Sequence, residues 1–370
     1  MKLSWKSLLG RASLPSFAAS VALGTALVVV SAMAVILPPL SEATPPGRNG
    51  EIAFARFRFV NSPLRQEIWV ANLDGSGLRR ITRVRANYLD SYPSWAPDGS
   101  KLLFTRCAPL HGSPCNGRST VWSVNADGSN LHMLSKACHR TGTSRAAIAR
   151  CPDNGQAAYS PNGNKIAYQL YTGVSGIGIA NSNLRHVHSL FPFGNKPGAP
   201  DINAIAWSPN GSQLAIAVHN DNSKRYKPVG GRAIYVINTN GSGLQRVTPW
   251  NLQAGSNNGE LDWSPDGTNI LFSTATYQIQ TDLSYGDIYI IHPNGSGLQR
   301  LTHFPPDTAV QLGSYSPDGT QIVFATTNNA TQDSGADWPD VFIMHADGTN
   351  ITPVTRTKNY ESVPQWGPAG

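Results

Sequence analysis

The sequence is poor in charge and in helical patterning. Charged residues make up 14% of the 370 residues, while Gly (35), Pro (27), Trp (9) and Tyr (12) are plentiful. After residue 50, no long stretch has the 3.6-residue apolar period of a helix. Many short strands joined by turns fit this composition better than helices do. The sequence therefore predicts an all-β protein.

Catalytic and nucleic-acid signatures are also missing. The chain has no HExxH, no GxSxG and no Gly-rich phosphate loop, which mark metallopeptidases, α/β-hydrolases and nucleotide-binding enzymes. The formal net charge is +7, but Lys and Arg are scattered and form no basic stripe of the kind that binds nucleic acid. We therefore predict no catalytic residue, no cofactor and no nucleic-acid partner.

Cysteine is scarce, and the four that occur fall within one 45-residue stretch: Cys107, Cys115, Cys138 and Cys151. An even number in an exported chain favours two disulfides, most simply Cys107–Cys115 and Cys138–Cys151, although three pairings are possible. The rival interpretation is a zinc site with His139, which the lack of a CxxC pair disfavours.

The N-terminus differs from the rest of the chain. Three basic residues precede an uncharged stretch whose apolar centre is FAASVALGTALVVVSAMAVIL (17–37). Such a helix is either an export signal, cleaved after Ala43, or an uncleaved membrane anchor. Both place the remainder outside the cytoplasm, in the periplasm or at the cell surface. We assign residues 1–43 to the signal peptide or anchor, 44–50 to a linker and 51–370 to the folded domain.

After the linker, the chain repeats one pattern. LDWSPDGTNILF (261–272) is nearly matched at 92–104, 157–168, 205–216 and 313–324, and VPQWGPAG (363–370) is a worn copy. Each copy holds four short apolar runs. SPDG joins the first two runs, and a turn with Asn-Gly or Asp-Gly joins the last two. The pattern predicts four-stranded antiparallel meanders, with six members of each strand type.

The apolar inner strands decide how these meanders assemble. Strands that are apolar on both faces need a packed neighbour on each side, and radial stacking in a β-propeller supplies it. We therefore predict six blades. The chain opens on a second-type strand, EIAFARF (51–57), and finishes on a first-type strand, ESVPQW (361–366). We expect these two strands to pair and close the ring.

The repeats also carry a family resemblance. The patterns W/Y-S-P-D/N-G-x-x-I/L-x-F and I-Y-V-x-N-x-D/N-G-S-G-L-x-R-L-T resemble the WD-like β-propeller repeats of the TolB family, over residues 47–370. The resemblance implies the fold, but one fold hosts many activities. TolB proper has a small α/β domain before its propeller and contacts an envelope lipoprotein in the periplasm. The linker 38–50 leaves no room for that domain, so the role in the Tol complex is not carried over.

The two faces of the predicted ring differ. Both tight turns fall on one face, called here the turn face, and they hardly vary between copies. The longer connections fall on the opposite face, called here the loop face, and they vary in length and chemistry. Variable loops on a rigid scaffold are where binding usually occurs.

Aromatic and basic side chains gather in these loops, as on surfaces that bind a protein or a glycan. The candidate binding residues are Tyr88, His139, Arg140, Arg145, Phe191, Phe193, Tyr226, Trp250, Tyr277, Tyr285, Phe304 and Trp338. The alternative interpretation is that the aromatics fill the loops and cap the channel ends.

These observations favour a monomeric, non-enzymatic binding or scaffold protein of the cell envelope that recognises a protein or a glycan. The alternative is an enzyme of carbohydrate or lactone chemistry, with a divalent, calcium-like metal held over the central channel as in several propeller families. Metal analysis of the purified protein would distinguish the two.

Overall fold

The computed structural model describes most of the chain after the N-terminal segment. The described residues are 47–58, 64–108, 119–136, 152–196, 198–220, 231–255, 261–274, 276–278, 283–305, 308, 310–326 and 339–370. Within them the regular structure is β, with one 3-10 turn, η1 (Trp250–Leu252). No helix in this part of the chain is long and apolar enough to cross a membrane. The expected N-terminal helix lies outside the described residues.

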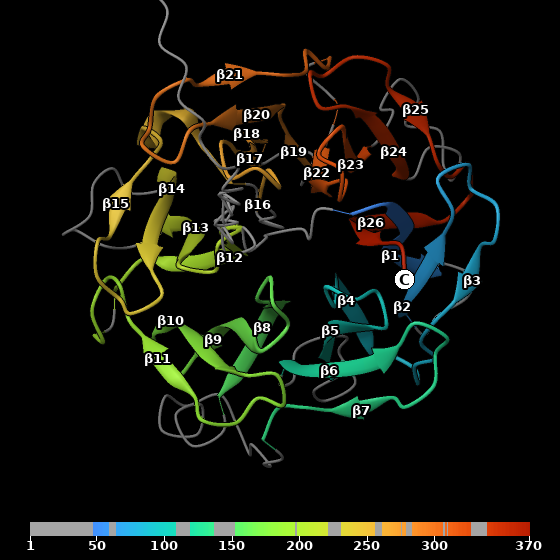
Figure 1. The fold of residues 1–370 in the computed structure, drawn as a ribbon, viewed down its shortest axis with the longest axis horizontal. Coiled ribbons are helices and arrows are strands. Elements are labelled where there is room, and N and C mark those ends of the chain that lie inside the picture. The colour runs from blue at the N-terminus through green and yellow to red at the C-terminus, as the bar shows by residue number, and fades with distance from the viewer. Residues whose placement is uncertain are drawn as a thin grey trace, which may run out of the picture. The chain divides into compact units, whose positions relative to one another are not determined.

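The strands form four-stranded antiparallel sheets that lie around a common centre within residues 40–370 (Figure 1). Sheet 1 has the order β26-β1-β2-β3, and sheet 2 has the order β4-β5-β6-β7. One parallel pair, Gln66 with Leu89, connects them. The bounds are β1 (Asn49–Arg58), β2 (Arg65–Ala71), β3 (Arg79–Arg80), β26 (Tyr360–Pro368), β4 (Leu89–Trp95), β5 (Lys101–Cys107), β6 (Ser119–Asn125) and β7 (His132–Met133).

Four more four-stranded sheets follow among the described residues, each with its strands in sequence order from the centre outward (Figure 1). Sheet 3 comprises β8 (Asp153–Tyr159), β9 (Lys165–Tyr171), β10 (Ser175–Asn181) and β11 (His188–Leu190). Sheet 4 comprises β12 (Asp201–Trp207), β13 (Gln213–Asn220), β14 (Gly231–Asn238) and β15 (Gln245–Arg246). Sheet 5 comprises β16 (Leu261–Trp263), β17 (Ile270–Ser273), β20 (Ile288–Ile291) and β21 (Gln299–Arg300). Sheet 6 comprises β22 (Val310–Tyr315), β23 (Gln321–Thr326), β24 (Asp340–His345) and β25 (Thr352–Pro353).

The first and last strands of the chain lie side by side. β26 pairs antiparallel with β1, with Ile52 opposite Trp366 and Arg56 opposite Glu361. Sheet 1 therefore takes its innermost strand from the C-terminus and its other strands from the N-terminal part of the chain.

Hydrophobic clusters occupy the spaces between neighbouring sheets. One cluster joins Ile216 of sheet 4 to Ile177 of sheet 3, and another joins Phe272 of sheet 5 to Ala217 of sheet 4. The remaining clusters lie between sheets 1 and 2, 2 and 3, 5 and 6, and 6 and 1. Each fully buried Leu, Ile or Phe contributes about 1.5–3 kcal/mol. Burial on both flanks explains why the inner strands are apolar at nearly every position.

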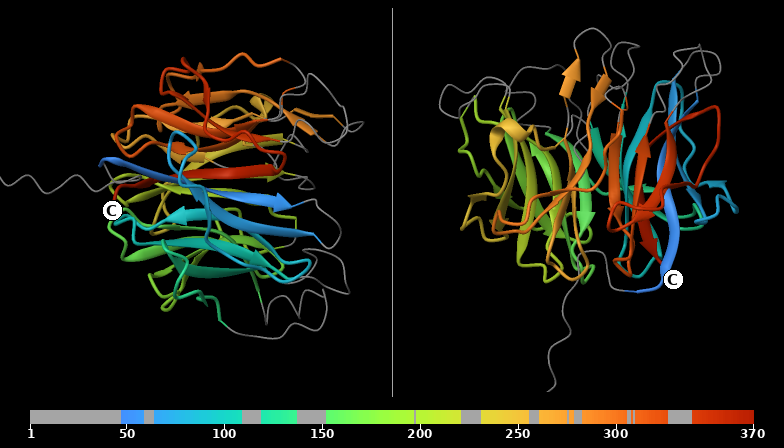
Figure 2. Two further views of the ribbon diagram at one scale, coloured as in Figure 1. Left: turned by 90° about the vertical axis from the view of Figure 1, so that its right-hand side faces the viewer. Right: turned by 90° about the horizontal axis from the view of Figure 1, so that it is seen from above.

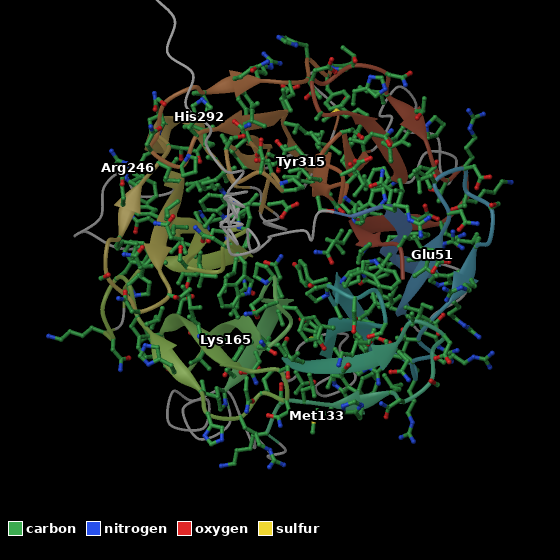
Figure 3. All side chains as sticks on the ribbon, in the orientation of Figure 1. Glu51, Met133, Lys165, Arg246, His292 and Tyr315 are labelled. Atoms are coloured by element: carbon green, nitrogen blue, oxygen red, sulfur yellow. The ribbon has the colours of Figure 1, made fainter. Side chains whose placement is uncertain are left out.

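The outer strands are much shorter than the sequence predicts. The run LRRIT (78–82) suggests five strand residues, but β3 pairs with β2 only through Arg79 and Arg80. Thr82 instead turns its hydroxyl back to accept a hydrogen bond from the Ile68 backbone. Residues of outer strands such as Met133 and Arg246 lie at the periphery in Figure 3, where one edge of the ladder faces solvent.

Two further features were not predicted. The loop 276–286 contains an extra hairpin, β18 (Thr276–Gln278) with β19 (Leu283–Tyr285). In addition, register shifts interrupt the pairing of β4, β8, β12, β22 and β26 with their neighbours. Such bulges bend a strand and increase its twist.

The SPDG turns have the geometry that the sequence predicts. In the turn of sheet 5, the Gly267 N–H donates to the Ser264 carbonyl. The Asp266 carboxylate accepts from the Thr268 N–H at 2.9 Å and from the Ser264 hydroxyl at 2.6 Å. In sheet 4, Asn210 accepts equivalent bonds from Ser212 and Ser208. The interchange of Asp and Asn is therefore a matter of turn geometry, as predicted.

Candidate functional site

Five of the predicted loop-face residues have described side chains. Tyr88, Phe191 and Phe304 are half-buried, whereas Phe193 and Trp250 are buried. Tyr277 and Tyr285 belong to the hairpin β18–β19, of which the backbone alone is described; in Figure 2 this hairpin rises on the side away from the C-terminus. The other candidates lie outside the described residues: His139, Arg140, Arg145, Tyr226 and Trp338.

Phe193 and Trp250 pack on one side chain of sheet 4. Their rings meet Tyr235 edge-on, with centroid distances of 5.2 Å for Phe193 and 6.1 Å for Trp250. Both belong to the cluster between sheets 3 and 4. Phe304 lies 6.0 Å from the ring of Phe324. These contacts match the alternative interpretation of the aromatics as packing residues; a binding role for the set stays a prediction.

Cys107, the last residue of β5, is disulfide-bonded. The other cysteines, Cys115, Cys138 and Cys151, lie outside the described residues. The pairing of the four therefore stays a prediction.

A buried ion pair lies near the loop-face end of sheet 1. The Arg56 guanidinium donates to Glu361 Oε1 from Nε at 2.9 Å and from Nη2 at 2.5 Å. The side chains are 5% and 0% exposed. Arg56 also stacks on Trp69, 4.4 Å from the ring centroid. The pair joins the first and last strands of the chain by charge as well as by backbone pairing.

Sheet 2 repeats this arrangement. Arg106 donates to the Asp90 carboxylate from Nε at 2.6 Å and from Nη2 at 2.8 Å, and stacks on Trp122 at 4.4 Å. The Arg106 and Asp90 side chains are 12% and 0% exposed. Burial raises the pKa of Asp90, while the hydrogen bond and charge of Arg106 lower it. Bidentate pairing in a site shielded from solvent is the strongest geometry for an arginine and a carboxylate.

Further polar groups surround Glu361. Its carboxylate accepts from the Thr357 hydroxyl at 3.0 Å and also from the Thr355 hydroxyl. Asp340 lies beside this group and accepts from the Thr357 N–H at 2.9 Å. Burial, and in addition the negative charge of Glu361, raise the pKa of Asp340 to about 6. Asp340 therefore titrates closer to neutral pH than an ordinary aspartate.

The innermost strands enclose a small central cavity of about 80 Å³. Side chains on its wall tie neighbouring sheets together: Gln365 accepts from the Trp95 N–H at 2.8 Å, and Asp262 accepts from the Tyr315 N–H at 2.9 Å. A cavity of this size has room for several waters, since one water needs about 10–15 Å³. It is smaller than the ~300–1,000 Å³ of pockets that hold organic ligands. Among the described residues, no group of three His, Cys, Asp or Glu side chains could hold a metal ion.

Sequence reasoning missed the two buried ion pairs. A signal was present in the sequence. Arginine interrupts the apolar runs at Arg56 and Arg106, and an acidic residue stands five positions before the tryptophan at or near the end of each innermost strand, at Glu361 and Asp90. The repeat pattern alone does not show that each arginine lies opposite an acidic residue of the neighbouring strand.

The arrangement of sheets defines a β-propeller, and comparisons with solved structures support that assignment. TolB from Acinetobacter baumannii superposes with a TM-score of 0.56 at 18% identity, over 86% of this chain and 67% of that one. A putative TolB from Agrobacterium tumefaciens gives 0.54 at 18% identity, over 86% and 100% of the two chains. Hydrazine synthase from Kuenenia stuttgartiensis gives 0.58 at 13% identity, over 87% and 48%. No family model matches the chain. The structure is thus a TolB-like propeller in fold, and such low identities carry the fold alone.

Proposed function

We propose that this chain is a six-bladed propeller of the cell envelope, closed by β26 and β1, that binds an envelope protein or glycan through its loop face. The count of six rests on the four-stranded sheets and on the clusters between them. The cluster that joins Trp366 of sheet 1 to Val323 of sheet 6 supports the closure.

The proposed location outside the cytoplasm rests on the N-terminal apolar segment (17–37). That segment acts either as a cleaved signal or as an anchor. The disulfide at Cys107 is consistent with an oxidising compartment.

One observation carries the binding role: the turn face is built from nearly identical turns, whereas the loop face is not. On the turn face, Asp98, Asn162 and Asp266 all use their side-chain oxygens for the same turn bonds. On the loop face, connections differ in length, and sheet 5 adds the hairpin β18–β19. Variation restricted to one face of a rigid scaffold is typical of a recognition surface.

The test is capture of partners from an envelope extract and binding to a glycan array by the purified protein. Two loop-face variants replace residues 139–150 or 221–230 by short Gly-Ser linkers, which spares β8 and β14. A matched control carries Leu244→Ala and Leu298→Ala, since these exposed side chains lie beside turns of the turn face. The proposal expects the loop variants to lose a partner that the control retains.

Identical capture and glycan binding by the intact protein and both loop variants would reject the proposal. One tightly held divalent ion per chain in elemental analysis would instead favour the metal-dependent enzyme. Melting curves of all variants separate lost binding from lost folding.

A further inference from the structure

Exposed apolar side chains recur at one position of the repeat. Among the described residues, seven large apolar side chains are exposed, and six of them directly follow the turn between the third and fourth strands of a sheet. These six are between 36% and 45% exposed. We call them the apolar rim: Leu78, Leu131, Val187, Leu244, Leu298 and Ile351.

The backbone places the six residues of the apolar rim equivalently. In each sheet the turn closes with the same hydrogen bond, as from the Asn238 N–H to the Ser242 carbonyl in sheet 4. The next residue has a positive φ, 67° at Gly243 and 55° at His186 of sheet 3, and the rim residue follows it. Sheet 3 has thus lost the glycine of this turn but keeps an apolar residue after it, Val187.

Packing between the sheets does not account for the apolar rim. None of its six residues belongs to the hydrophobic clusters that fill the spaces between sheets. Single exposed apolar side chains are common on protein surfaces, whereas a group of them on one face marks a contact surface. The seventh exposed side chain in the described part of the chain, Tyr171, ends β9 on the loop face.

The apolar rim runs around the turn face, with one residue in each sheet. Met133 and Arg246, each two positions after a rim residue, lie at the periphery in Figure 3. A protein interface of standard size covers about 800 Å² of one partner, but the rim passes through all six sheets. A broad, flat partner is therefore the kind that can contact the six residues together.

The first described residues of the chain lie on this same face. The Gly47 N–H donates to the Pro317 carbonyl at 3.3 Å, in the SPDG turn of sheet 6. Asn49 and Asp318 exchange two hydrogen bonds, at 3.0 and 3.2 Å. The apolar segment 17–37 ends ten positions before Gly47, and ten residues span at most about 36 Å. The face that carries the apolar rim is thus the face that is tethered close to the apolar segment.

We propose that the turn face lies on a lipid bilayer, with the apolar rim inserted among the lipid headgroups and the loop face directed away from the membrane. Apolar side chains of proteins at a membrane surface reach about 5–10 Å into the boundary between headgroups and acyl chains. The polar turn residues beside the rim, such as Asp74 and Ser242, meet headgroups and water. The inference rests on the proposed location in the envelope, but not on binding at the loop face.

The proposed orientation presents the loop face to its partners. The seven residues of β9 run from the turn face to the loop face, and a strand of this length spans about 23 Å. The headgroup layer on one side of a bilayer is only about 5–8 Å thick. The loop face therefore stands clear of the lipid when the turn face rests on it.

The test is photo-crosslinking of the full chain, reconstituted in vesicles of phosphatidylcholine and phosphatidylethanolamine. The photoreactive amino acid p-benzoylphenylalanine replaces Leu298 of the apolar rim or, as the matched control, Tyr171, which is 40% exposed on the loop face. Mass spectrometry measures the lipid adducts. We expect at least about ten-fold more adduct at Leu298, because Tyr171 lies beyond the headgroup layer.

A second variant removes half of the apolar rim. Leu78→Ser, Leu131→Ser and Ile351→Ser are combined, with the probe kept at Leu298. The lipid adduct should fall about five-fold, because the tethered propeller rests on the bilayer only while several weak contacts act together. Tyr171→Ser, with the same probe, should leave the adduct unchanged. Because the contacts are apolar, the adduct should also be the same at low and high salt.

Melting curves check the fold of each variant, and the comparison of the two probe positions needs no rim substitution. Equal lipid adducts at Leu298 and Tyr171 would overturn the inference. So would an unchanged adduct after loss of half the rim, or adducts of Leu298 with a second copy of the chain in place of lipid.

Two further measurements separate this inference from the proposals above. A chain that purifies without residues 1–43, as its mass would show, is mixed with the same vesicles and should still give more lipid adduct at Leu298 than at Tyr171. Equal adducts there would also count against the turn face as the membrane contact. The linker variant of residues 221–230 should keep its lipid adducts, so loss of partner binding and loss of membrane contact are distinguishable.

Discussion

Sheets 1 and 2 differ from sheets 3, 4 and 6 at one pair of positions on their two innermost strands. In sheets 1 and 2 the pair is charged and buried, Arg56 with Glu361 and Arg106 with Asp90. At the matching register the other sheets hold polar or apolar pairs: Asn154–Leu170, Ile202–Val218 and Val310–Thr326. The backbone pairing is the same in each case, so the fold does not require the charges.

The stacking partner changes together with the pair. Arg56 and Arg106 each cover a tryptophan of the third strand, Trp69 and Trp122. The corresponding residue is Gly178 in sheet 3 and Tyr235 in sheet 4, as the strand registers show. The repeat therefore specifies the backbone, while the side chains that pack at the loop-face end differ from sheet to sheet. In sheet 1 the buried ion pair also joins the two ends of the chain.

Deletion of the C-terminal strand should destabilise sheet 1, and with it the difference between sheets 1 and 2 and the others, more than any other change. Deletion of residues 361–370 strips sheet 1 of its innermost strand, leaves Arg56 without Glu361 and removes Trp366 from the cluster with sheet 6. We expect a fall in melting temperature larger than that of any substitution discussed here, or loss of cooperative unfolding, measured by calorimetry. The control is deletion of Gly370 alone. An unchanged melting curve for the long deletion would contradict the closure of sheet 1 by β26.

The single substitution Arg106→Leu is expected to have the next largest effect. It leaves the fully buried Asp90 without its partner, and an uncompensated buried charge costs about 3–5 kcal/mol. Denaturant unfolding measures the loss. Arg246→Leu is a matched control, because Arg246 is exposed on the outer strand β15 and should change stability by less than about 1 kcal/mol. Equal losses of unfolding free energy for the two variants would show that burial does not increase the contribution of the ion pair to stability.

Transplanting the pair of sheet 3 into sheet 2 should sharpen the comparison. Asp90→Asn with Arg106→Leu reproduces the native pair Asn154–Leu170, and the new Asn can still accept a hydrogen bond. Replacing a buried ion pair by a neutral pair of similar volume is often neutral or stabilising. We expect the double variant to recover most of the stability lost by Arg106→Leu alone, in the same denaturant assay. A double variant as unstable as the single one would mean that sheet 2 depends on the charges.

The sequence predicts the strands and turns far better than it predicts these side-chain arrangements. Turn chemistry such as Pro265-Asp266-Gly267 is local, so the strand order and the meander follow from short motifs. The pairing of β26 with β1 followed from the strand types at the two ends of the chain. The length of β3 did not, because the Thr82 hydroxyl competes for the Ile68 N–H and ends the ladder.

The candidate site was much harder to predict, because burial in the folded chain determines which side chains are available for binding. Phe193 and Trp250 lie in loop segments by sequence, yet both rings pack on Tyr235. The pairing of Arg56 with Glu361 joins residues 305 positions apart, which no local pattern reports. The cavity lined by Pro209, Pro265 and Pro317 likewise depends on how three separate turns come together near Tyr315. Tertiary placement, and not residue type, separates a packing aromatic from a binding one.

The smallest expected effect is a pH dependence at the polar group beside Glu361. The pKa of Asp340 is about 6 in the folded chain and near 3.9 in an unfolded one. Between these two values the folded state binds more protons, so this group makes the protein more stable as the pH falls from about 7 to about 4.

Asp340→Asn fixes the group in a neutral form that still accepts from the Thr357 N–H. The variant should melt slightly higher than the unaltered protein at pH 7.5, and the difference should shrink by pH 5. Asp74→Asn is the control that should not vary over this range. Hydrogen bonds from Ser76 lower the pKa of Asp74 below its ordinary value, so its charge is present at both pH 7.5 and pH 5, and its contribution is lost only in stronger acid. Parallel shifts of both variants across this range would show that Asp340 does not titrate separately from the turn aspartates.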